Sequence, residues 1–353
     1  MKVSYAGIFL TAVMLAAALP LHAEISLGGA LRNDFLVMKP TNNQANFNNT
    51  LELKLVFTRA AEEWKFYADA RISLYAGLIT NITQTDLGLN LLRAFIRYYS
   101  PAGVITLGKT YMNFGIRGMF NPFEMVKNVN FTDLNYDLEG MIALTWELGF
   151  DELSGLKTYV RPDPALSNSG GGLALYTHLG TFDLGAIYNR KAYDRNVAGV
   201  YFKGDIELGV NGAWAYHFDD YGTNRFNEAN LGLDYSFFDG KLILALVFYF
   251  DETGAENSSS YNPFSTVDKY FKAKYYSYAN ISVVFDEFFS MQADGFFNMI
   301  DGSGLAMPQV KYTLSDGLSV GALAGIPWGP DKSEFSPNTS GEFSILGRFE
   351  AKL

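Results

Sequence analysis

Charged side chains gather in two neighbouring parts of the chain, and their types suggest an electrostatic filter. The basic residues between positions 65 and 109 are Lys65, Arg71, Arg93, Arg97 and Lys109. The segment that follows, 111–139, carries Glu124, Asp133, Asp137 and Glu139 together with Arg117 and Lys127. Opposed charges across a water-filled constriction create a field that separates passing solutes by charge and dipole. A plainer interpretation is that these charges only hydrate the wall of a wide water-filled space, and the sequence leaves both open.

Other candidate sites in the sequence are weak. His178 and His217 are the two histidines after residue 23, and neither stands at a metal-ligand spacing from another histidine, although 217–220 (His-Phe-Asp-Asp) could be drawn as a site. No Ser-centred nucleophile elbow is present, and the chain has no cysteine. We therefore expect no metal, no cofactor and no catalytic residue.

The elements that must position the charges are strands. In residues 64–74, apolar side chains alternate with polar ones, which is the period of a strand and not of a helix. The apolar set is Trp64, Phe66, Ala68, Ala70, Ile72 and Leu74, and the other set is Lys65, Tyr67, Asp69, Arg71 and Ser73. Counted along this alternation, all five basic residues between 65 and 109 are expected to face inward.

The same reading along the whole chain predicts eighteen strands, with sixteen as the alternative, in an antiparallel up-and-down transmembrane β-barrel. The predicted strands are 26–37, 50–58, 64–74, 89–99, 104–110, 140–149, 156–161, 172–178, 182–191, 197–203, 206–218, 226–236, 241–250, 273–285, 289–299, 306–314, 318–326 and 341–353. The weakest are 104–110, 156–161 and 197–203. After the first 23 residues the longest clear apolar run, 242–250, is too short for a spanning helix.

The connections between these strands are expected to alternate in length. Short turns are predicted at 101–103, 179–181, 237–240, 286–288 and 315–317, and longer polar loops at 39–48, 76–88, 162–171, 251–272 and 327–340. Short turns at one end and long loops at the other are typical of a barrel in an outer membrane. The connection 111–139 is longer than loops in compact domains usually are, which indicates a function.

Residues 1–23 have the composition of a secretory signal peptide. Lys2 precedes an apolar stretch, and Pro20 and Ala23 mark the expected cleavage region. We predict one barrel domain over 24–353, exported through the inner membrane to the outer membrane. The chain contains 22 Tyr, 29 Phe and 4 Trp, a composition that strands and membrane interfaces favour, and its net charge of −10 argues against a nucleic-acid partner.

Two stretches resemble Gram-negative outer-membrane porins. Residues 107–123 read Leu-Gly-Lys-Thr-Tyr-Met-Asn-Phe-Gly-Ile-Arg-Gly-Met-Phe-Asn-Pro-Phe, similar to a porin-like run in which a strand ending in Leu-Gly-Lys/Arg leads to a Gly-containing segment and Phe-Asn-Pro. The C-terminal strand 341–353 resembles the assembly signal of such barrels, but it ends in Leu353 where an aromatic residue is usual. The resemblance implies a porin-like fold in which the long third outer loop, 111–139, folds into the barrel and narrows the pore.

The leading hypothesis is a passive diffusion channel for small hydrophilic solutes, surrounded by outer-membrane lipid. The alternative is a non-conducting surface receptor or adhesin that uses loops such as 251–272. A soluble exported sandwich conflicts with the apolar outward faces, which would be exposed to water. Association into a homo-oligomer is left open by the sequence, as is the permeating solute.

Overall fold

Each strand of the chain pairs with its sequence neighbour, so that the wall is built in chain order. The computed structural model describes residues 24–40, 45–79, 82–112, 114–115, 120–123, 140–163, 168–191, 195–221, 223–261 and 271–353. The predicted signal peptide, 1–23, lies outside the described residues and stays a prediction. The strands are β1 (Glu24–Lys39), β2 (Asn46–Ala60), β3 (Trp64–Ile79), β4 (Ile82–Ser100), β5 (Gly103–Thr110), β6 (Met141–Gly149), β7 (Gly155–Arg161), β8 (Gly170–Leu179), β9 (Phe182–Lys191), β10 (Arg195–Asp205), β11 (Gly209–Asp219), β12 (Arg225–Phe237), β13 (Leu242–Asp251), β14 (Tyr275–Val284), β15 (Phe289–Asn298), β16 (Gly304–Ser315), β17 (Leu318–Trp328) and β18 (Phe343–Lys352).

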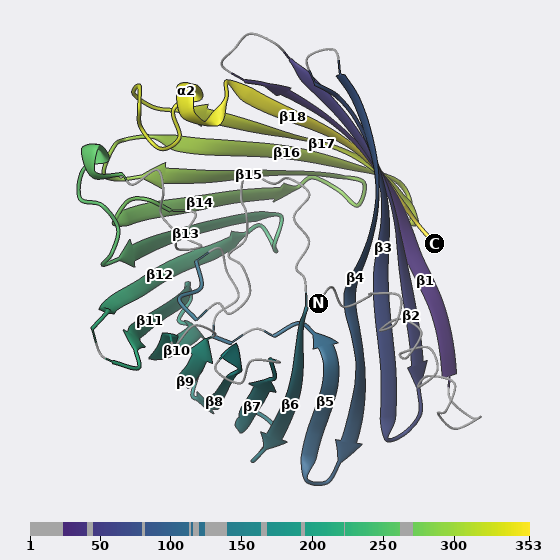
Figure 1. Ribbon diagram of the computed structural model, residues 1–353, viewed down its shortest axis with the longest axis vertical. Helices are drawn as coiled ribbons and strands as arrows, with labels where there is room; N and C mark the ends of the chain where they lie inside the picture. The colour runs from purple at the N-terminus through teal and green to yellow at the C-terminus, as the bar shows by residue number, and fades with distance from the viewer. Residues whose placement is uncertain are drawn as a thin grey trace.

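The last strand closes on the first. β1 pairs antiparallel with both β2 and β18, and Asp34 of β1 lies opposite Arg348 of β18. All eighteen strands therefore belong to one closed sheet with antiparallel neighbours (Figure 1). The predicted fold class is confirmed, and the barrel has eighteen strands and not sixteen. The three strands that were weakest in the sequence are present as β5, β7 and β10.

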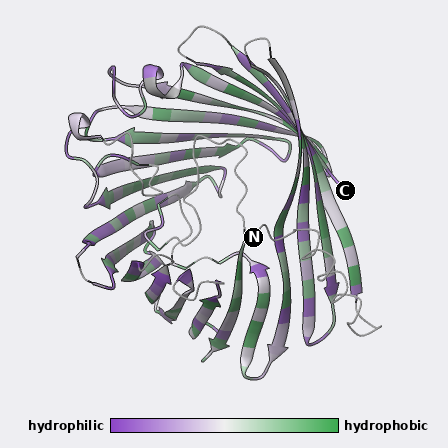
Figure 2. Cartoon of the chain, viewed as in Figure 1, coloured by the Kyte–Doolittle hydropathy of each residue, from purple (hydrophilic) through white to green (hydrophobic). Residues whose placement is uncertain are grey.

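Alternation along the strands gives the wall an apolar outer face and a polar inner face. In β3 and β2, Leu74 lies opposite Leu51 and both are exposed, whereas Arg71 lies opposite Lys54 on the other face. Figure 2 shows the alternation as green and purple segments along single strands. Exposed leucine, phenylalanine and tryptophan side chains on an outer face are typical of a barrel wall that faces lipid.

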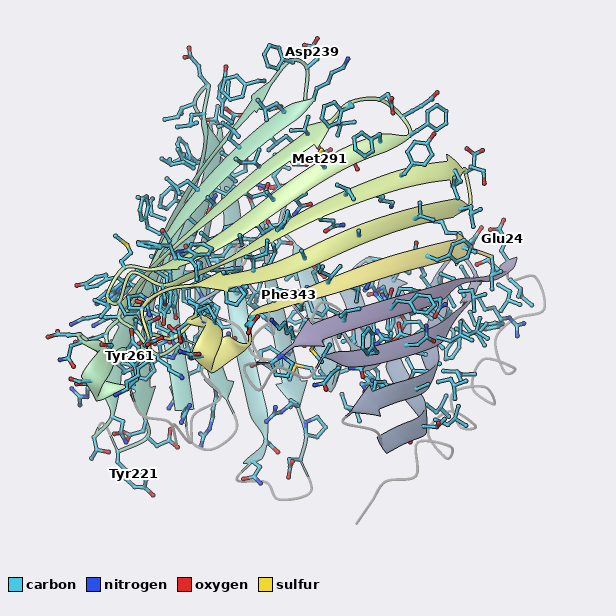
Figure 3. The ribbon with its side chains drawn as sticks, turned by 90° about the horizontal axis from the view of Figure 1, so that it is seen from above. Glu24, Tyr221, Asp239, Tyr261, Met291 and Phe343 are labelled. Atoms are coloured by element: carbon cyan, nitrogen blue, oxygen red, sulfur yellow. The ribbon has the colours of Figure 1, made fainter. Side chains whose placement is uncertain are left out.

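The two ends of the barrel differ in their connections. Asp239, in the turn between β12 and β13, and Tyr221, between β11 and β12, lie at opposite ends of the wall (Figure 3). The predicted turn at 237–240 is confirmed, and Phe238, Asp239 and Gly240 all have positive φ there (54°, 54° and 87°). Two short helical turns, η2 (Ser258–Ser260) and α2 (Pro337–Ser340), lie in connections at the end of the barrel where Tyr221 lies. No helix in the described part of the chain is long and apolar enough to cross a membrane.

The predicted long loop at 76–88 is wrong. β3 continues to Ile79 and β4 begins at Ile82, so the two strands form a hairpin that extends over most of this range. The polar run 80–86 was interpreted as a loop because strands were expected to alternate with apolar residues throughout. Beyond the apolar belt a strand no longer needs an apolar outer face, and main-chain hydrogen bonds alone continue the pairing.

Candidate functional site in the lumen

A continuous row of charged side chains crosses the inner face of β18, β1, β2, β3 and β4. Its cations come from all five strands, and its carboxylates come from the middle three. The cations are Arg348, Arg32, Lys54, Arg71 and Arg93, and the carboxylates are Asp34, Glu52 and Asp69. Because directly opposite residues in antiparallel strands share a face, the register of the strands fixes this row on the inner face.

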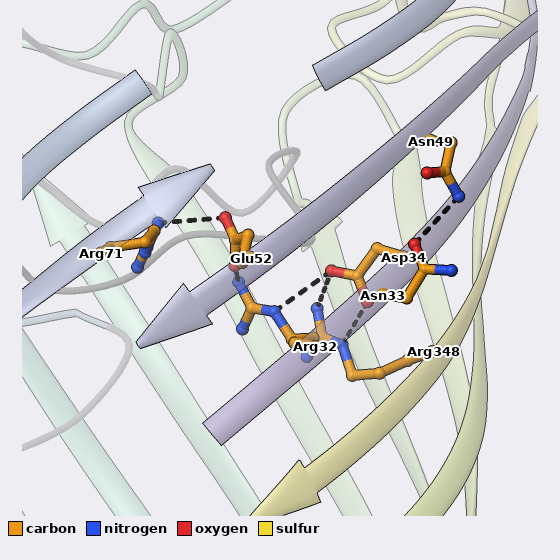
Figure 4. Close-up of polar contacts among 7 residues, drawn as sticks. All are labelled: Arg32, Asn33, Asp34, Asn49, Glu52, Arg71 and Arg348. Atoms are coloured by element: carbon orange, nitrogen blue, oxygen red, sulfur yellow. Dashed lines mark hydrogen bonds and ion pairs between the residues drawn. The ribbon is translucent and has the colours of Figure 1, made fainter. Parts of the chain in front are cut away.

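The first half of the row is a chain of ion pairs across the seam where the barrel closes (Figure 4). Arg348 donates from Nε and Nη2 to the two oxygens of Asp34, at 2.8 and 3.0 Å. Arg32 lies 3.3 Å from the same carboxylate and also donates to Glu52. Arg71 donates to the second oxygen of Glu52, at 3.4 Å. One closing strand pair is therefore joined by side chains as well as by its main-chain ladder.

The second half of the row surrounds Asp69 of β3. Arg93 of β4 donates to Asp69 Oδ2 from Nη2 (2.7 Å) and Nε (3.1 Å), and it also donates to the Tyr67 hydroxyl at 2.7 Å. Lys54 of β2 lies 3.9 Å from the same carboxylate. The Tyr67 hydroxyl of β3 donates to the same oxygen at 3.3 Å, so groups from three strands share one buried carboxylate.

Burial within the row makes its accessible face positive. The side chains of Asp34 and Asp69 are each 1% exposed, whereas those of Arg348 and Arg93 are 30% and 35% exposed. The carboxylates lie against the wall and the guanidinium groups lie between them and the lumen. A solute in the lumen therefore meets cations first.

Lys65 and Arg97 add positive charge that no carboxylate offsets. They lie directly opposite each other on β3 and β4, an arrangement that is unfavourable for like charges. Arg97 donates to the Thr106 hydroxyl at 3.2 Å, and its guanidinium lies 5.3 Å from the Phe95 ring centre. Neither cation forms an ion pair with another residue in the described ranges. Within the described residues, this pair therefore adds uncompensated positive charge to this wall.

The wall across the ring, β12 to β15 in Figure 1, carries a different chemistry. Asp294 of β15 accepts hydrogen bonds from Tyr278 (2.5 Å), Asn280 (2.7 Å) and Gln292 (2.8 Å), all of them neutral donors. Asp234 of β12 lies on the same inner face, opposite Ala245. Acidic and neutral polar groups thus lie across the lumen from the basic row, as a transverse field requires.

The described residues of the long connection after β5 pack on the inner wall. Phe123 is fully buried, and it forms one apolar cluster with Met112 and Phe114. The wall residues in this cluster are Ala143, Tyr159, Ala174, Ile187, Val197, Ala213 and Ala215. Further round, the Phe120 ring stacks on Tyr249 of β13, with centroids 4.6 Å apart and planes at 8°. These described residues therefore contact inward-facing side chains of β6–β11 and of β13.

The Gly-containing segment and Phe-Asn-Pro-Phe form one local clasp. The Asn121 side chain donates to the Phe114 carbonyl at 3.0 Å and accepts from the Phe123 main-chain N–H at 3.1 Å. Gly115 has φ +84°, and a Cβ there would approach the Phe123 ring to 2.5 Å. Only glycine fits both the backbone conformation and this close contact. Within the described residues, these contacts tie residues 114 and 115 to residues 121 and 123.

Three outer connections also fold against the wall at β14 to β16. Glu334, between β17 and β18, accepts from the Tyr276 hydroxyl (2.5 Å) and the Asn298 amide (2.8 Å). Asp301, between β15 and β16, accepts from the Tyr261 hydroxyl (2.9 Å) and the Glu334 main-chain N–H (2.8 Å). Burial raises the pKa of Glu334 above its ordinary value. These bonds attach the connections to the lumen side of the barrel.

The predicted site residues divide into those that face the lumen, those that lie outside the described residues, and Lys109, which faces outward. Lys65, Arg71, Arg93 and Arg97 lie on the inner face as expected. Arg117, Glu124, Asp133, Asp137 and Glu139 lie outside the described residues, so the predicted partnership between basic wall and acidic loop stays a prediction.

The inward orientation predicted for Lys109 is wrong. Lys109 lies opposite Ala94 and Ile142, on the outward face that Leu107 also occupies. Its ammonium group donates to the Leu91 main-chain carbonyl at 2.6 Å, which supplies the polar partner that a cation on this face needs. Alternation from Leu107 already required this orientation, and the residue type was given too much weight.

The two histidines take ordinary places on the wall. His178 lies 2.8 Å from Asp183 beside a short turn, and His217 stacks on Phe226 with ring centroids 4.4 Å apart. Within the described ranges no three metal-binding side chains come together. The expectation of no metal site stays a prediction.

Of the eight residues in the basic row, only Arg71 and Arg93 were singled out from the sequence. The Asp34–Arg348 pair is hard to find in the sequence, because 314 positions separate its two residues. The available signal was closure itself: a barrel brings its first and last strands together, so inward charges on both become neighbours.

The closed barrel, its apolar outer face and its charged lumen define a porin-type transmembrane β-barrel. Solved structures with this fold include OccAB4 of Acinetobacter baumannii (TM-score 0.62, 8% identity, 94% of this chain and 98% of that one). The outer membrane protein OprD from Pseudomonas aeruginosa has a TM-score of 0.59 at 9% identity, over 93% of this chain and 94% of its own. OccK7 (OpdD) of Pseudomonas aeruginosa has the same TM-score and identity, over 94% of this chain and 99% of its own.

No protein-family model matches the sequence, and no curated protein matches it. The expected likeness to porin-like barrels is confirmed for the fold.

Proposed function

We propose that the chain is a passive channel through which small hydrophilic solutes cross an outer membrane. One observation carries the proposal: a closed eighteen-stranded barrel has exposed apolar side chains outside and part-exposed cations inside. Eighteen antiparallel strands enclose a lumen wide enough for water. The fold of OprD, whose name places it in the outer membrane, supports the same location for this chain.

In this proposal the basic row guides anionic parts of solutes along one side of the lumen. The ion pairs keep the row rigid, because each buried carboxylate is held by cations from neighbouring strands. Lys65 and Arg97 supply the field that a solute feels, since no carboxylate offsets them. The segment around Phe114 to Phe123 narrows the passage from the opposite side.

Exchanging Lys65 and Arg97 together for glutamine is expected to shift permeation toward cations. Unit charges about 4 Å apart interact by roughly 4 kcal/mol at an effective dielectric near 20, and about a quarter of that is roughly a fivefold change in relative permeability. Reversal potentials across a salt gradient in a planar bilayer measure the change. The shift should shrink toward 1 M salt, where the Debye length falls to about 3 Å.

Arg190→Gln/Arg225→Gln is the matched control, because both cations lie on the outward face of the barrel. This variant should keep the reversal potential of the unmodified protein. Arg93 is a poorer target, since its loss would also leave Asp69 without its main partner. An unchanged reversal potential in Lys65→Gln/Arg97→Gln would refute the role given to these cations. A barrel that conducts no ions at all would favour the surface receptor instead.

A further inference from the structure

The outward face of β9 to β12 carries a row of two arginines, a buried asparagine and a phenylalanine at the end of the barrel opposite Asp239. Arg190 lies opposite Asn196, Asn196 opposite Phe218, and Phe218 opposite Arg225. The four residues therefore form a single level across four strands. They share the face of Tyr188 and Trp214, which are both exposed.

Beneath this row lie aromatic and then apolar levels. The next level contains Tyr188, Ala198, Tyr216 and Asn227, and the one after it contains Ala186, Val200, Trp214 and Ala229. Tyr216 and Phe218 stack with ring centroids 5.7 Å apart. A surface that changes from cationic to aromatic to aliphatic matches the change from headgroup to acyl chain in a lipid leaflet.

The cations in this row remain accessible. Arg225 is exposed and has no ion-pair partner in the described ranges. The Arg190 side chain is 45% exposed although it lies 2.8 Å from Asp220, and Asp220 also accepts from the Asn196 amide at 2.7 Å. The second carboxylate of this rim, Asp219, is bound by Thr223 and Asn224 of its own turn.

Two other outward-facing cations near this end of the described barrel are already engaged. Lys39 lies 2.5 Å from Glu342, and Lys109 is bonded to the Leu91 carbonyl. On the far side of the row, the Glu252 carboxylate accepts from Asn227 of β12, so an acidic group limits the row at β13. The row across β9 to β12 is the part of the described outer rim where exposed arginines stand above an aromatic level.

We propose that this row binds the phosphorylated headgroup of a lipid in the outer leaflet. Arg190 and Arg225 would bind phosphate oxygens, for which the guanidinium fork is well shaped. Tyr188, Tyr216 and Trp214 would contact the glycerol or sugar region and the first part of the acyl chains. The inference rests on the proposed membrane location and concerns the outer surface only.

The test is binding of diphosphoryl lipid A to the purified full-length mature protein in detergent. Arg190→Gln/Arg225→Gln should bind it roughly thirtyfold more weakly, because each basic residue near an anionic membrane surface contributes roughly 1 kcal/mol. Lys203→Gln/Lys241→Gln, which removes two exposed cations at the other end of the barrel, should bind like the unmodified protein. Heat-modified migration on a gel checks that each variant is folded.

Three results would overturn the proposal. The first is equal binding by Arg190→Gln/Arg225→Gln and the unmodified protein. The second is equal binding of lipid A from which the phosphates have been removed, which would leave only apolar contact. The third is full competition by inorganic phosphate at the same concentration, which would show a site for the free ion. If the barrel conducts ions but does not bind lipid A, the channel proposal stands and the lipid proposal fails. If the barrel binds lipid A but does not conduct, the lipid proposal stands and the channel proposal fails.

Discussion

Replacing Phe120 and Phe123 by alanine is expected to raise the single-channel conductance. Phe123 is fully buried on the inner wall, and Phe120 stacks on Tyr249 while its carbonyl accepts a hydrogen bond from Asn230. Each buried Phe→Ala change removes about 3 to 5 kcal/mol of packing. Losing both anchors should release the segment from the wall and widen the path, and conductance in a planar bilayer at fixed salt measures this.

The matched control for this double variant is Phe237→Ala/Phe285→Ala. Both of its phenylalanines are exposed at the end of the barrel where Asp239 lies, beside the short turns, so the lumen should be unaffected. A folded Phe120→Ala/Phe123→Ala barrel with unchanged conductance would show that the segment does not narrow the pore. The same result would remove the predicted role of residues 111–139.

Arg93→Gln is expected to destabilise the barrel more than Arg93→Gln combined with Asp69→Asn. Asp69 is 1% exposed, so removing its main cation leaves a buried carboxylate with only the more distant Lys54 and the neutral Tyr67 hydroxyl as partners. A stranded charge in a fully buried pair costs about 3 to 5 kcal/mol, and about 2 to 3 is expected here because Arg93 is partly solvated. Neutralising Asp69 as well should recover most of this loss.

Urea unfolding of the refolded barrel in detergent, followed by tryptophan fluorescence, gives the free energies for all three variants. Asp69→Asn alone should cost less than Arg93→Gln alone, because the guanidinium left behind reaches water. If the double variant were less stable than Arg93→Gln, the carboxylate would be held by something other than this cation. Equal stability of all variants would mean that the pair contributes nothing.

Much of the fold followed from the sequence because a barrel wall repeats one rule. Alternation places Lys65 and Arg71 inward and Leu74 outward, and local pairing turns that rule into neighbouring strands. Short turns such as 237–240 are also local. The hairpin beyond residue 76 was missed because the alternation weakens outside the apolar belt, where pairing is maintained by the main chain.

The candidate site was less predictable because it depends on closure and on burial. The Asp34–Arg348 pair joins the two ends of the sequence, and its ion pair depends on a register that alternation cannot supply. The exposure of each charged side chain depends on how close its charged group lies to the barrel wall. No pattern in the sequence shows that Asp69 is buried while Arg93 is partly exposed. Lys109 shows the reverse case, where alternation was right and residue type was misleading.

The most direct test of the proposed channel is swelling of liposomes that contain the mature protein. Neutral hydrophilic solutes of increasing size should enter at rates that fall steadily with size, because passive diffusion through a water-filled lumen depends on the fit of the solute to the pore. Liposomes without protein provide the baseline. Rapid swelling with the smallest sugars and slower swelling with larger ones is the predicted result, and swelling no faster than the baseline for every solute would contradict a diffusion channel.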